Sequence, residues 1–206
     1  MVLLGPPGAG KGTLARDLAE CAHFSVFVTG DVLRKAIQEE TELGRSIKSN
    51  VEAGRLVDDE TILTLVRDFL RSHREGVIFD GFPRTIGQAK ALESIIGADS
   101  LGVVYLELSE EMVLKRLGSR RNCPACGKIY NLLSNPPLKD GTCDDCGCAL
   151  IVRKDDDPDI IKSRYDVYLK ETAPLVEYYD GRLIKVNADR SVDEVFHDVR
   201  GKLCQE

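Results

Sequence analysis

The sequence predicts an α/β fold in which a five-stranded parallel sheet is flanked by helices. Five short apolar runs support this prediction, because each is separated from the next by sequence with helical periodicity, as in a sheet buried on both faces. The runs are residues 2–4, 24–28, 77–79, 101–108 and 183–186. Two segments interrupt the alternation: residues 28–57 are helical and rich in charge, and residues 119–156 contain five of the seven cysteines. We expect a core of 1–27, 58–118 and 157–206 with two insertions.

Composition narrows the class of protein. With 206 residues, of which 43% are hydrophobic, the chain can bury one sizeable core. The net charge of −6 argues against a non-specific nucleic-acid binder, which needs surplus Lys and Arg. No apolar run reaches the roughly 18 residues of a membrane span, and no signal peptide is evident. We therefore expect a cytoplasmic protein without nucleic-acid or membrane partners.

The first run leads into a phosphate-binding loop. Residues 5–13 read GPPGAGKGT and match the pattern Gly, four residues, Gly-Lys between a strand and a helix. The glycines permit many backbone N–H groups to converge on one anion, and Lys11 reaches the phosphates. This is the phosphate-loop NTPase type of α/β fold, so we expect a bound nucleoside triphosphate. A glycine-rich turn with a solvated lysine is the alternative, and Gly12 departs from the usual Ser or Thr after the lysine.

Later helices have recognisable starts. Ser109 begins one helix, the Asp157-Pro158 pair begins another, and Ser191 with Glu194 forms a possible capping box for the last. Arg116 and Arg120 lie four apart, so on one helix they would repel each other unless an anion relieved the repulsion. The alternative is that both cations merely complement the helix dipole.

Asp80 follows the apolar run 76–79. It therefore stands at the carboxyl edge of the predicted sheet, where α/β proteins bind ligands. The alternative role is to cap the turn that follows it.

The cysteines predict a structural zinc site. Two Cys-x-x-Cys pairs, Cys123 with Cys126 and Cys143 with Cys146, are separated by 16 residues, which is typical of a four-cysteine zinc ribbon. Four thiolates complete a tetrahedron and leave no position for a catalytic water. Cys148 could compete for the metal, although a bystander role is the simpler interpretation.

Four stretches of the chain resemble the adenylate kinases. They are residues 5–13, TGDVLR at 29–34, DGFPRT at 80–85 and RKDD at 153–156. The resemblance extends over nearly the whole chain, and in this family a glycine does follow the loop lysine. It implies Mg²⁺-dependent transfer of a phosphate from ATP to AMP, a monophosphate-binding insertion at 28–57, a zinc-ribbon-like lid at 119–156, and a monomer.

The resemblance also implies roles for individual residues. It places at ATP Gly8, Ala9, Gly10, Lys11, Gly12, Thr13, Arg116, Arg120, Ile129, Tyr130 and Arg190. It places at AMP Thr29, Arg34, Arg55, Val57, Gly81, Arg84, Gln88, Arg153 and Arg164. Catalysis falls to Lys11, Arg84, Arg120, Arg153 and Arg164, and Asp80 lies near magnesium through water. Asp155 and Asp156 are expected to hold the lid arginines.

Two other functions are compatible with the sequence. A kinase for UMP, CMP or GMP could use the same core, although the long lid, Thr29 and the amide of Gln88 favour adenine. A zinc-ribbon module joined to a nucleotide switch is the other alternative. Residues 119–156 hold six Lys or Arg against five Asp or Glu, and this near balance argues against nucleic-acid binding by the ribbon.

Overall fold

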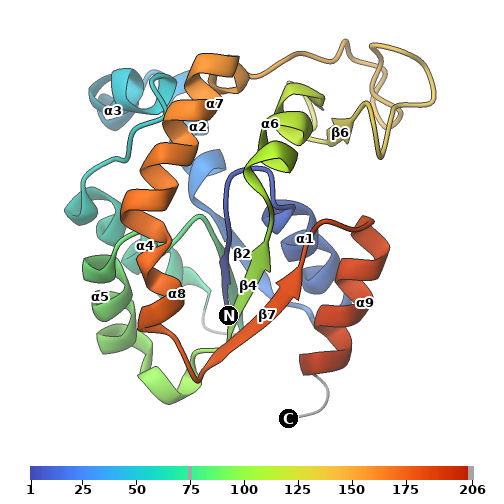
Figure 1. Cartoon of the computed structure of the whole chain (residues 1–206). Coiled ribbons are helices and arrows are strands. Elements are labelled where there is room, and N and C mark those ends of the chain that lie inside the picture. Colours follow the sequence, from blue (N-terminus) through green and yellow to red (C-terminus); the bar gives the residue numbers. More distant parts are fainter. Residues whose placement is uncertain (74–75, 204–206) are drawn as a thin grey trace.

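A computed structural model describes residues 1–73 and 76–203. Its central sheet is parallel throughout and has the strand order β2-β3-β1-β4-β7 (Figure 1). The strands are β1 (Val2–Leu4), β2 (Ser25–Val28), β3 (Val77–Asp80), β4 (Val103–Glu107) and β7 (Leu183–Asn187). All five predicted strands are confirmed, and their boundaries differ from the apolar runs by at most two residues.

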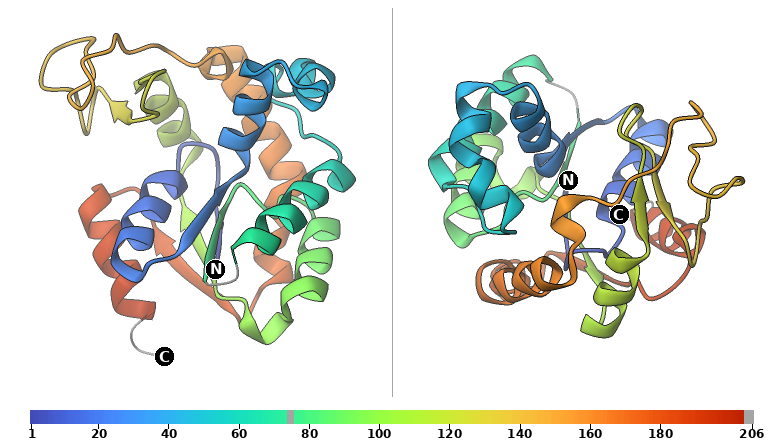
Figure 2. Two further views of the ribbon diagram at one scale, coloured as in Figure 1. Left: turned by 180° about the vertical axis from the view of Figure 1, so that it is seen from behind. Right: turned by 90° about the horizontal axis from the view of Figure 1, so that it is seen from above.

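Helices cover both faces of this sheet (Figures 1 and 2). The helices are α1 (Lys11–Ala22), α2 (Thr29–Gln38), α3 (Glu42–Glu52), α4 (Asp59–Ser72), α5 (Ile86–Ile96), α6 (Glu110–Gly118), α7 (Pro158–Val167), α8 (Pro174–Tyr178) and α9 (Val192–Leu203). Helices α1 and α9 pack together on one face, whereas α4, α5 and α8 supply side chains to the other. Among the described residues, no helix is both long and apolar enough to cross a bilayer.

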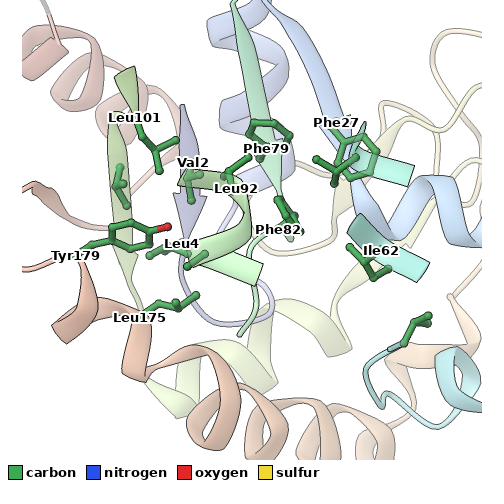
Figure 3. Close-up of a cluster of buried hydrophobic side chains, with 14 of the residues drawn as sticks. Val2, Leu4, Phe27, Ile62, Phe79, Phe82, Leu92, Leu101, Leu175 and Tyr179 are labelled. Atoms are coloured by element: carbon green, nitrogen blue, oxygen red, sulfur yellow. The ribbon is translucent and has the colours of Figure 1, made fainter. Parts of the chain in front are cut away.

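The sheet divides the apolar core into two clusters because successive strand side chains point to opposite faces. Val2 and Leu4 belong to the cluster that contains Leu92 and Tyr179 (Figure 3). Leu3, between them, belongs to the cluster formed with α1 and α9. All five side chains are at most 3% exposed, so β1 is buried on both faces as its continuous apolar sequence predicts.

The two segments that interrupt the alternation lie at the carboxyl edge of the sheet. Helices α2 and α3 follow β2 directly, and the short antiparallel pair β5 (Arg120–Asn122) and β6 (Ile129–Asn131) follows α6. Figure 2 shows α2 and α3 on one side of this edge and the segment after β6 on the other. The space between them is therefore bordered by parts of the chain far apart in sequence.

The predicted helix starts are confirmed. Ser109 and Asp157 accept backbone hydrogen bonds at the N-termini of α6 and α7. Ser191 and Glu194 exchange side-chain to backbone hydrogen bonds of 3.0 and 3.3 Å, which is a capping box. The placement of Arg120 on the helix of Arg116 was wrong, because α6 ends at Gly118 and Arg120 begins β5. Repulsion between these two arginines on one helix therefore does not occur.

Gly44 permits the close contact of α3 with α2. A Cβ at this position would lie 2.0 Å from the carbonyl oxygen of Ala36 and 2.7 Å from the nitrogen of Ile37. Gly44→Ala should therefore lower the free energy of unfolding by roughly 1–3 kcal/mol, because the helices must separate. Chemical denaturation would measure this difference.

Gly201→Ala is the matched control for that prediction. Gly201 lies in α9, and no described atom outside the helix's own backbone comes within 4 Å of an added Cβ. Its replacement should leave stability unchanged or raise it by up to about 1 kcal/mol, since alanine favours the helix. Equal effects of the two substitutions would contradict the contact described for Gly44.

Candidate active site

A cleft opens at the carboxyl edge of the sheet, between β1 and β3. The connection after β1 leads to α1 on one face and the connection after β3 leads to α5 on the other, which leaves a crevice between the two strands. The cleft has a volume of about 680 Å³. A smaller cavity adjoins it and shares five lining residues with it, namely Leu33, Arg55, Leu56, Gly81 and Arg84.

The phosphate loop forms one wall of the cleft. Gly8 and Gly10 have φ angles of 80° and 92°, in the left-handed region that residues with a Cβ rarely adopt. Gly10 precedes α1, whose first turn has no side-chain cap and no acidic residue, unlike the capped starts of α4 and α6. The uncapped N–H groups and the helix dipole together suit a bound anion.

Lys11 lies against this loop. Its Nζ donates hydrogen bonds of 2.8 Å to the carbonyl oxygens of Gly5 and Pro6. Burial lowers the pKa of the ammonium to about 8, and the nearby Asp80 carboxylate opposes this shift. Two of the three ammonium donors are used by the loop, so one remains for a ligand.

Arginines from several elements of the core, the insertion and the lid line the cleft. The arginines among its lining residues are Arg16, Arg34, Arg55, Arg84, Arg116, Arg120, Arg153, Arg164 and Arg190. Burial lowers the pKa of Arg153 to about 10, and Arg120 and Arg34 add to the shift by repulsion. Nε of Arg153 is buried without a hydrogen-bond partner in the described structure. The cleft therefore has a surplus of positive charge that an anionic ligand would offset.

Two aspartates balance part of this charge. Asp156, which is 3% exposed, accepts hydrogen bonds from Arg120 Nε at 2.7 Å and Arg164 Nη1 at 3.0 Å. Asp155 lies 3.1 Å from Arg164 and 3.9 Å from Arg34. Although burial alone raises it, these guanidinium groups hold the pKa of Asp155 below its usual range. Asp156 therefore holds the lid arginine Arg120 as predicted, whereas Asp155 pairs with Arg164 on α7 and Arg34 on α2, outside the lid. The two aspartates connect the lid to α7 and α2.

Arg116 contacts the other end of the cleft. Its Nη2 donates to the carbonyl oxygens of Ala188 at 2.7 Å and Arg190 at 3.1 Å, both in the connection between β7 and α9. Arg190 in turn pairs with Asp198 at 2.6 Å. Arg116 and Arg120, four apart in sequence, therefore have separate partners on opposite sides of the lid base.

The smaller cavity is lined by polar groups that are already ordered. Gln88 is 2% exposed, and its Oε1 accepts a 2.8 Å hydrogen bond from the backbone N–H of Arg84. Its Nε2 donates to Asp59 Oδ1 at 2.7 Å. The hydroxyl of Thr29 lines the same cavity and is buried without a partner in the described structure. An unpaired buried hydroxyl costs about 1–3 kcal/mol, so this position suits a ligand.

Asp80 ends β3 beside the phosphate loop. Its Oδ2 lies 3.0 Å from the place where a Cβ on Gly12 would stand, and its charge acts on Lys11. Within the described ranges its carboxylate accepts no hydrogen bond from the turn that follows. The turn-capping alternative therefore has no support in the structure.

The four predicted cysteine ligands come together in the lid. Sγ of Cys123 lies 3.3 Å from Sγ of Cys146, Sγ of Cys126 lies 3.5 Å from Sγ of Cys143, and all four sulfurs are within 4.8 Å of one another. These separations exceed a disulfide bond of about 2.05 Å. They suit a zinc ion, whose four sulfur ligands at about 2.3 Å stand about 3.8 Å apart in a tetrahedron. Cys148 is not part of this group.

The ligand turns repeat one geometry. The N–H of Cys123 bonds to the carbonyl of Lys128, and the N–H of Cys143 bonds to the carbonyl of Cys148, both at 2.9 Å. A hydrogen bond from the hydroxyl of Tyr130 lowers the pKa of Cys143 to about 6. The lowered pKa favours the thiolate form of Cys143, which is the form that binds a metal ion. Cys148 occupies in the second turn the place that Lys128 occupies in the first.

Comparison with known proteins decides the family. A profile described as "Adenylate kinase" matches residues 3–184. The chain belongs to the adenylate kinase family. It is 50% identical to an adenylate kinase of Pseudothermotoga lettingae, in an alignment that covers 97% of this chain and 95% of the relative. It is 45% identical to an adenylate kinase of Thermosipho africanus, with 97% and 96% covered, and 44% identical to one of Fervidobacterium nodosum, with 95% and 93% covered.

The structure brings the site residues expected of this adenylate kinase family member to one place. Every residue expected at ATP, and Asp80, lines the larger cleft. The residues expected at AMP line the two adjoining cavities, with Thr29, Val57 and Gln88 in the smaller one. Sequence reasoning missed Asp59, which lies 29 residues from Gln88 and has no local motif. It also missed Asn122, whose Oδ1 accepts a 3.0 Å hydrogen bond from Arg153.

The pKa of Lys11 predicts a pH dependence of nucleotide binding. Without ligand the ammonium loses its proton as the pH rises through about 8, whereas a neighbouring phosphate favours the charged form and raises this pKa. Binding then takes up a proton above about pH 8, so the affinity for ADP should fall by up to about tenfold per pH unit there. Calorimetric titration at several pH values between about 7 and 9 would measure this slope.

Lys11→Met is the control for this pH dependence. A phosphate group has its second ionisation near pH 6, so the charge of ADP changes little in the tested range. The variant should bind ADP weakly and lack the added slope. A wild-type affinity that stays constant across this range would contradict the assignment of the slope to Lys11.

Proposed function

We propose that the chain catalyses reversible transfer of the terminal phosphate of ATP to AMP, giving two ADP. One observation carries the proposal: the phosphate-loop cleft adjoins a small polar cavity lined by Thr29 and Gln88, and Arg84 lines both. A triphosphate on the loop and a nucleoside monophosphate in the small cavity would therefore meet at a cluster of cations. The names of the relatives agree with this reaction.

The protein needs to position the two substrates and to neutralise their charge, and no covalent intermediate with the protein is required. Phosphoryl transfer requires the two oxygen atoms to be in line and the charge of the moving group to be neutralised. The positive charge would come from five side chains that line the cleft, namely Lys11, Arg84, Arg120, Arg153 and Arg164. We assign no side-chain nucleophile and no general base to the reaction.

ATP would lie along the phosphate loop, with residues 8–13 around its phosphates. Arg116, Ile129, Tyr130 and Arg190 line the cleft beyond the loop, where the adenosine of ATP would fit. Magnesium, when bound, neutralises phosphate charge, and Asp80 would hold it through water because its carboxylate faces the loop beside Lys11. Arg120 begins the lid and Thr13 lies in α1, so the lid and core both contact this substrate.

AMP would lie between α2, the residues after α3 and the start of α5. We place its phosphate among four arginines that line the larger cleft, Arg34, Arg84, Arg153 and Arg164. We place its base among residues that line the smaller cavity, Thr29, Val57, Gly81 and Gln88. Arg55 lines both cavities, and its Nη2 donates a hydrogen bond of 3.1 Å to Oδ1 of Asn50. Water is a competing phosphate acceptor, so we propose that the insertion 28–57 and the lid 119–156 close over both substrates.

We further propose that the lid carries one structural zinc ion. Four thiols crowded within 4.8 Å cannot all ionise without a cation to offset their charge, and zinc would supply it. Thiolate ligands require a reducing compartment, which agrees with a cytoplasmic location. We expect the protein to act as a monomer, because the residues proposed at both substrates come from one chain.

The test of the proposed reaction is the choice of acceptor. ADP formation from ATP and Mg²⁺ is measured with AMP, CMP, UMP, GMP or no acceptor in separate reactions. Turnover should require AMP, because the amide of Gln88 can pair with adenine. If only a different monophosphate supports turnover, that monophosphate and not AMP is the acceptor. Turnover that is independent of any acceptor would refute the kinase assignment.

Lys11→Met gives the corresponding loss of function. The variant should fold normally, because the two hydrogen bonds of the lysine in the described structure are both local, to carbonyls of the same loop. It should lose about 10³-fold or more in turnover. Circular dichroism and thermal melting would verify the fold of the variant.

The zinc proposal predicts a metal-dependent lid. Protein purified under reducing conditions should hold about one zinc per chain by atomic emission, and Cys143→Ser should lose it with a fall in melting temperature. Cys21→Ser is the control, since Cys21 is exposed on α1, away from the lid. A metal content near zero in the wild type would defeat the proposal.

A further inference from the structure

We propose that Asp59 is a positioning residue that fixes the side-chain amide of Gln88 in one orientation and thereby selects adenine over 6-oxopurines. This inference rests on the proposed function, because it concerns the base of the acceptor monophosphate. Asp59 lies in the first turn of α4, which packs against α5, the helix that carries Gln88 (Figure 1).

Both oxygens of Asp59 are engaged with the start of α5. Oδ1 accepts from Gln88 Nε2 at 2.7 Å, and Oδ2 accepts from the hydroxyl of Thr85 at 2.8 Å. The same hydroxyl caps α5 by accepting from the N–H of Gln88 at 3.1 Å. Asp59 is not needed as the cap of its own helix, because Asp58 accepts from the N–H of Thr61 at 2.8 Å. The side chain of Asp59 is therefore free to hydrogen-bond to Gln88 and Thr85, on the neighbouring helix.

The partners of Gln88 permit only one orientation of its amide. A carboxylate can only accept a hydrogen bond, and the backbone N–H of Arg84 can only donate one. Rotating the amide by 180° would set Oε1 against the Asp59 carboxylate and the NH₂ group against the N–H of Arg84. Both unfavourable contacts would lie at a side chain that is 2% exposed, where an unpaired polar group is costly.

The fixed amide keeps one donor and one acceptor available. Nε2 uses one of its two hydrogens on Asp59, and Oε1 uses one of its two lone pairs on Arg84. Adenine offers an amino donor at position 6 beside the acceptor N1, so the amino group can meet Oε1 while N1 meets Nε2. Hypoxanthine and guanine reverse this pattern with a carbonyl oxygen at position 6 and a hydrogen on N1.

The arginines proposed at the phosphate would fix the position of the nucleotide, and with it the direction in which position 6 of the base faces the amide of Gln88. Because the ribose and phosphate hold the base in one place, a 6-oxopurine could pair only if the amide turned over. Asp59 opposes that rotation directly. Loss of its charge leaves only the N–H of Arg84 to oppose it.

The experiment compares AMP with IMP, whose bases differ at position 6 and N1 but have the same size. In Asp59→Asn the side chain keeps its shape but can offer Gln88 either a donor or an acceptor. The ratio of kcat/KM for AMP to that for IMP should fall roughly tenfold, with most of the change in KM. Each ratio is taken on one preparation, so partial loss of folded protein cancels.

Glu60→Gln is the matched control. Glu60 is the next residue of the same helix turn and is exposed, and its replacement removes the same unit of charge. In the described structure Gln88 is hydrogen-bonded to Arg84, Thr85 and Asp59, and not to Glu60. It should retain the wild-type ratio. An unchanged ratio in Asp59→Asn, or an equal loss of activity toward AMP and IMP, would overturn the role of Asp59 while leaving the kinase assignment intact. A wild-type enzyme without AMP-dependent turnover would overturn both.

Discussion

Concentrated positive charge is the constraint on which the rest of the site depends. Lys11 and the guanidinium groups of Arg84, Arg120 and Arg164 act on one another strongly enough that their mutual repulsion contributes to the lowered pKa of Lys11. Asp80, Asp155 and Asp156 offset part of this charge from within the chain, and Asp156 does so at 3% exposure. The chain therefore folds with a field that is incompletely balanced. Substrate phosphates would complete the balance, which explains how a protein of net charge −6 can bind polyanions.

Asp156 also decides how the lid is attached. It joins Arg120, the first residue of the lid strands, to Arg164 on α7, while Arg116 fixes the end of α6 to the connection after β7. Breaking a buried ion pair by removing one partner costs several kcal/mol. Movement of the lid would thus be easier in the segments beyond these anchors, around the cysteine turns, than at its base. The zinc proposed there would keep the moving part in one shape.

Much of the fold was predictable because its signals are local. Apolar runs gave the five strands, the phosphate loop gave the first wall of the cleft, and Ser191 with Glu194 gave the last helix start. The two Cys-x-x-Cys pairs, Cys123 with Cys126 and Cys143 with Cys146, predicted the cluster of four sulfurs. Arg120 was misplaced because the helix was extended past Gly118, although a glycine after the basic last turn of Lys115 and Arg116 is a typical helix end. Asp59 was missed because its partner Gln88 is brought near only when α4 packs on α5, and such a contact depends on the assembled tertiary structure.

The division of the core by the sheet bears on how the two substrates are supported. The cluster that holds Val2 and Leu4 continues into the insertion through Leu33, Ile47 and Val57, and Leu33 and Val57 line the proposed monophosphate site. The cluster on the opposite face includes Ala9 of the phosphate loop and Leu14 of α1. Each nucleotide site therefore has its own hydrophobic support, and the sheet separates the two. Sequence change within one cluster can alter the fit of one substrate while the packing beneath the other is preserved.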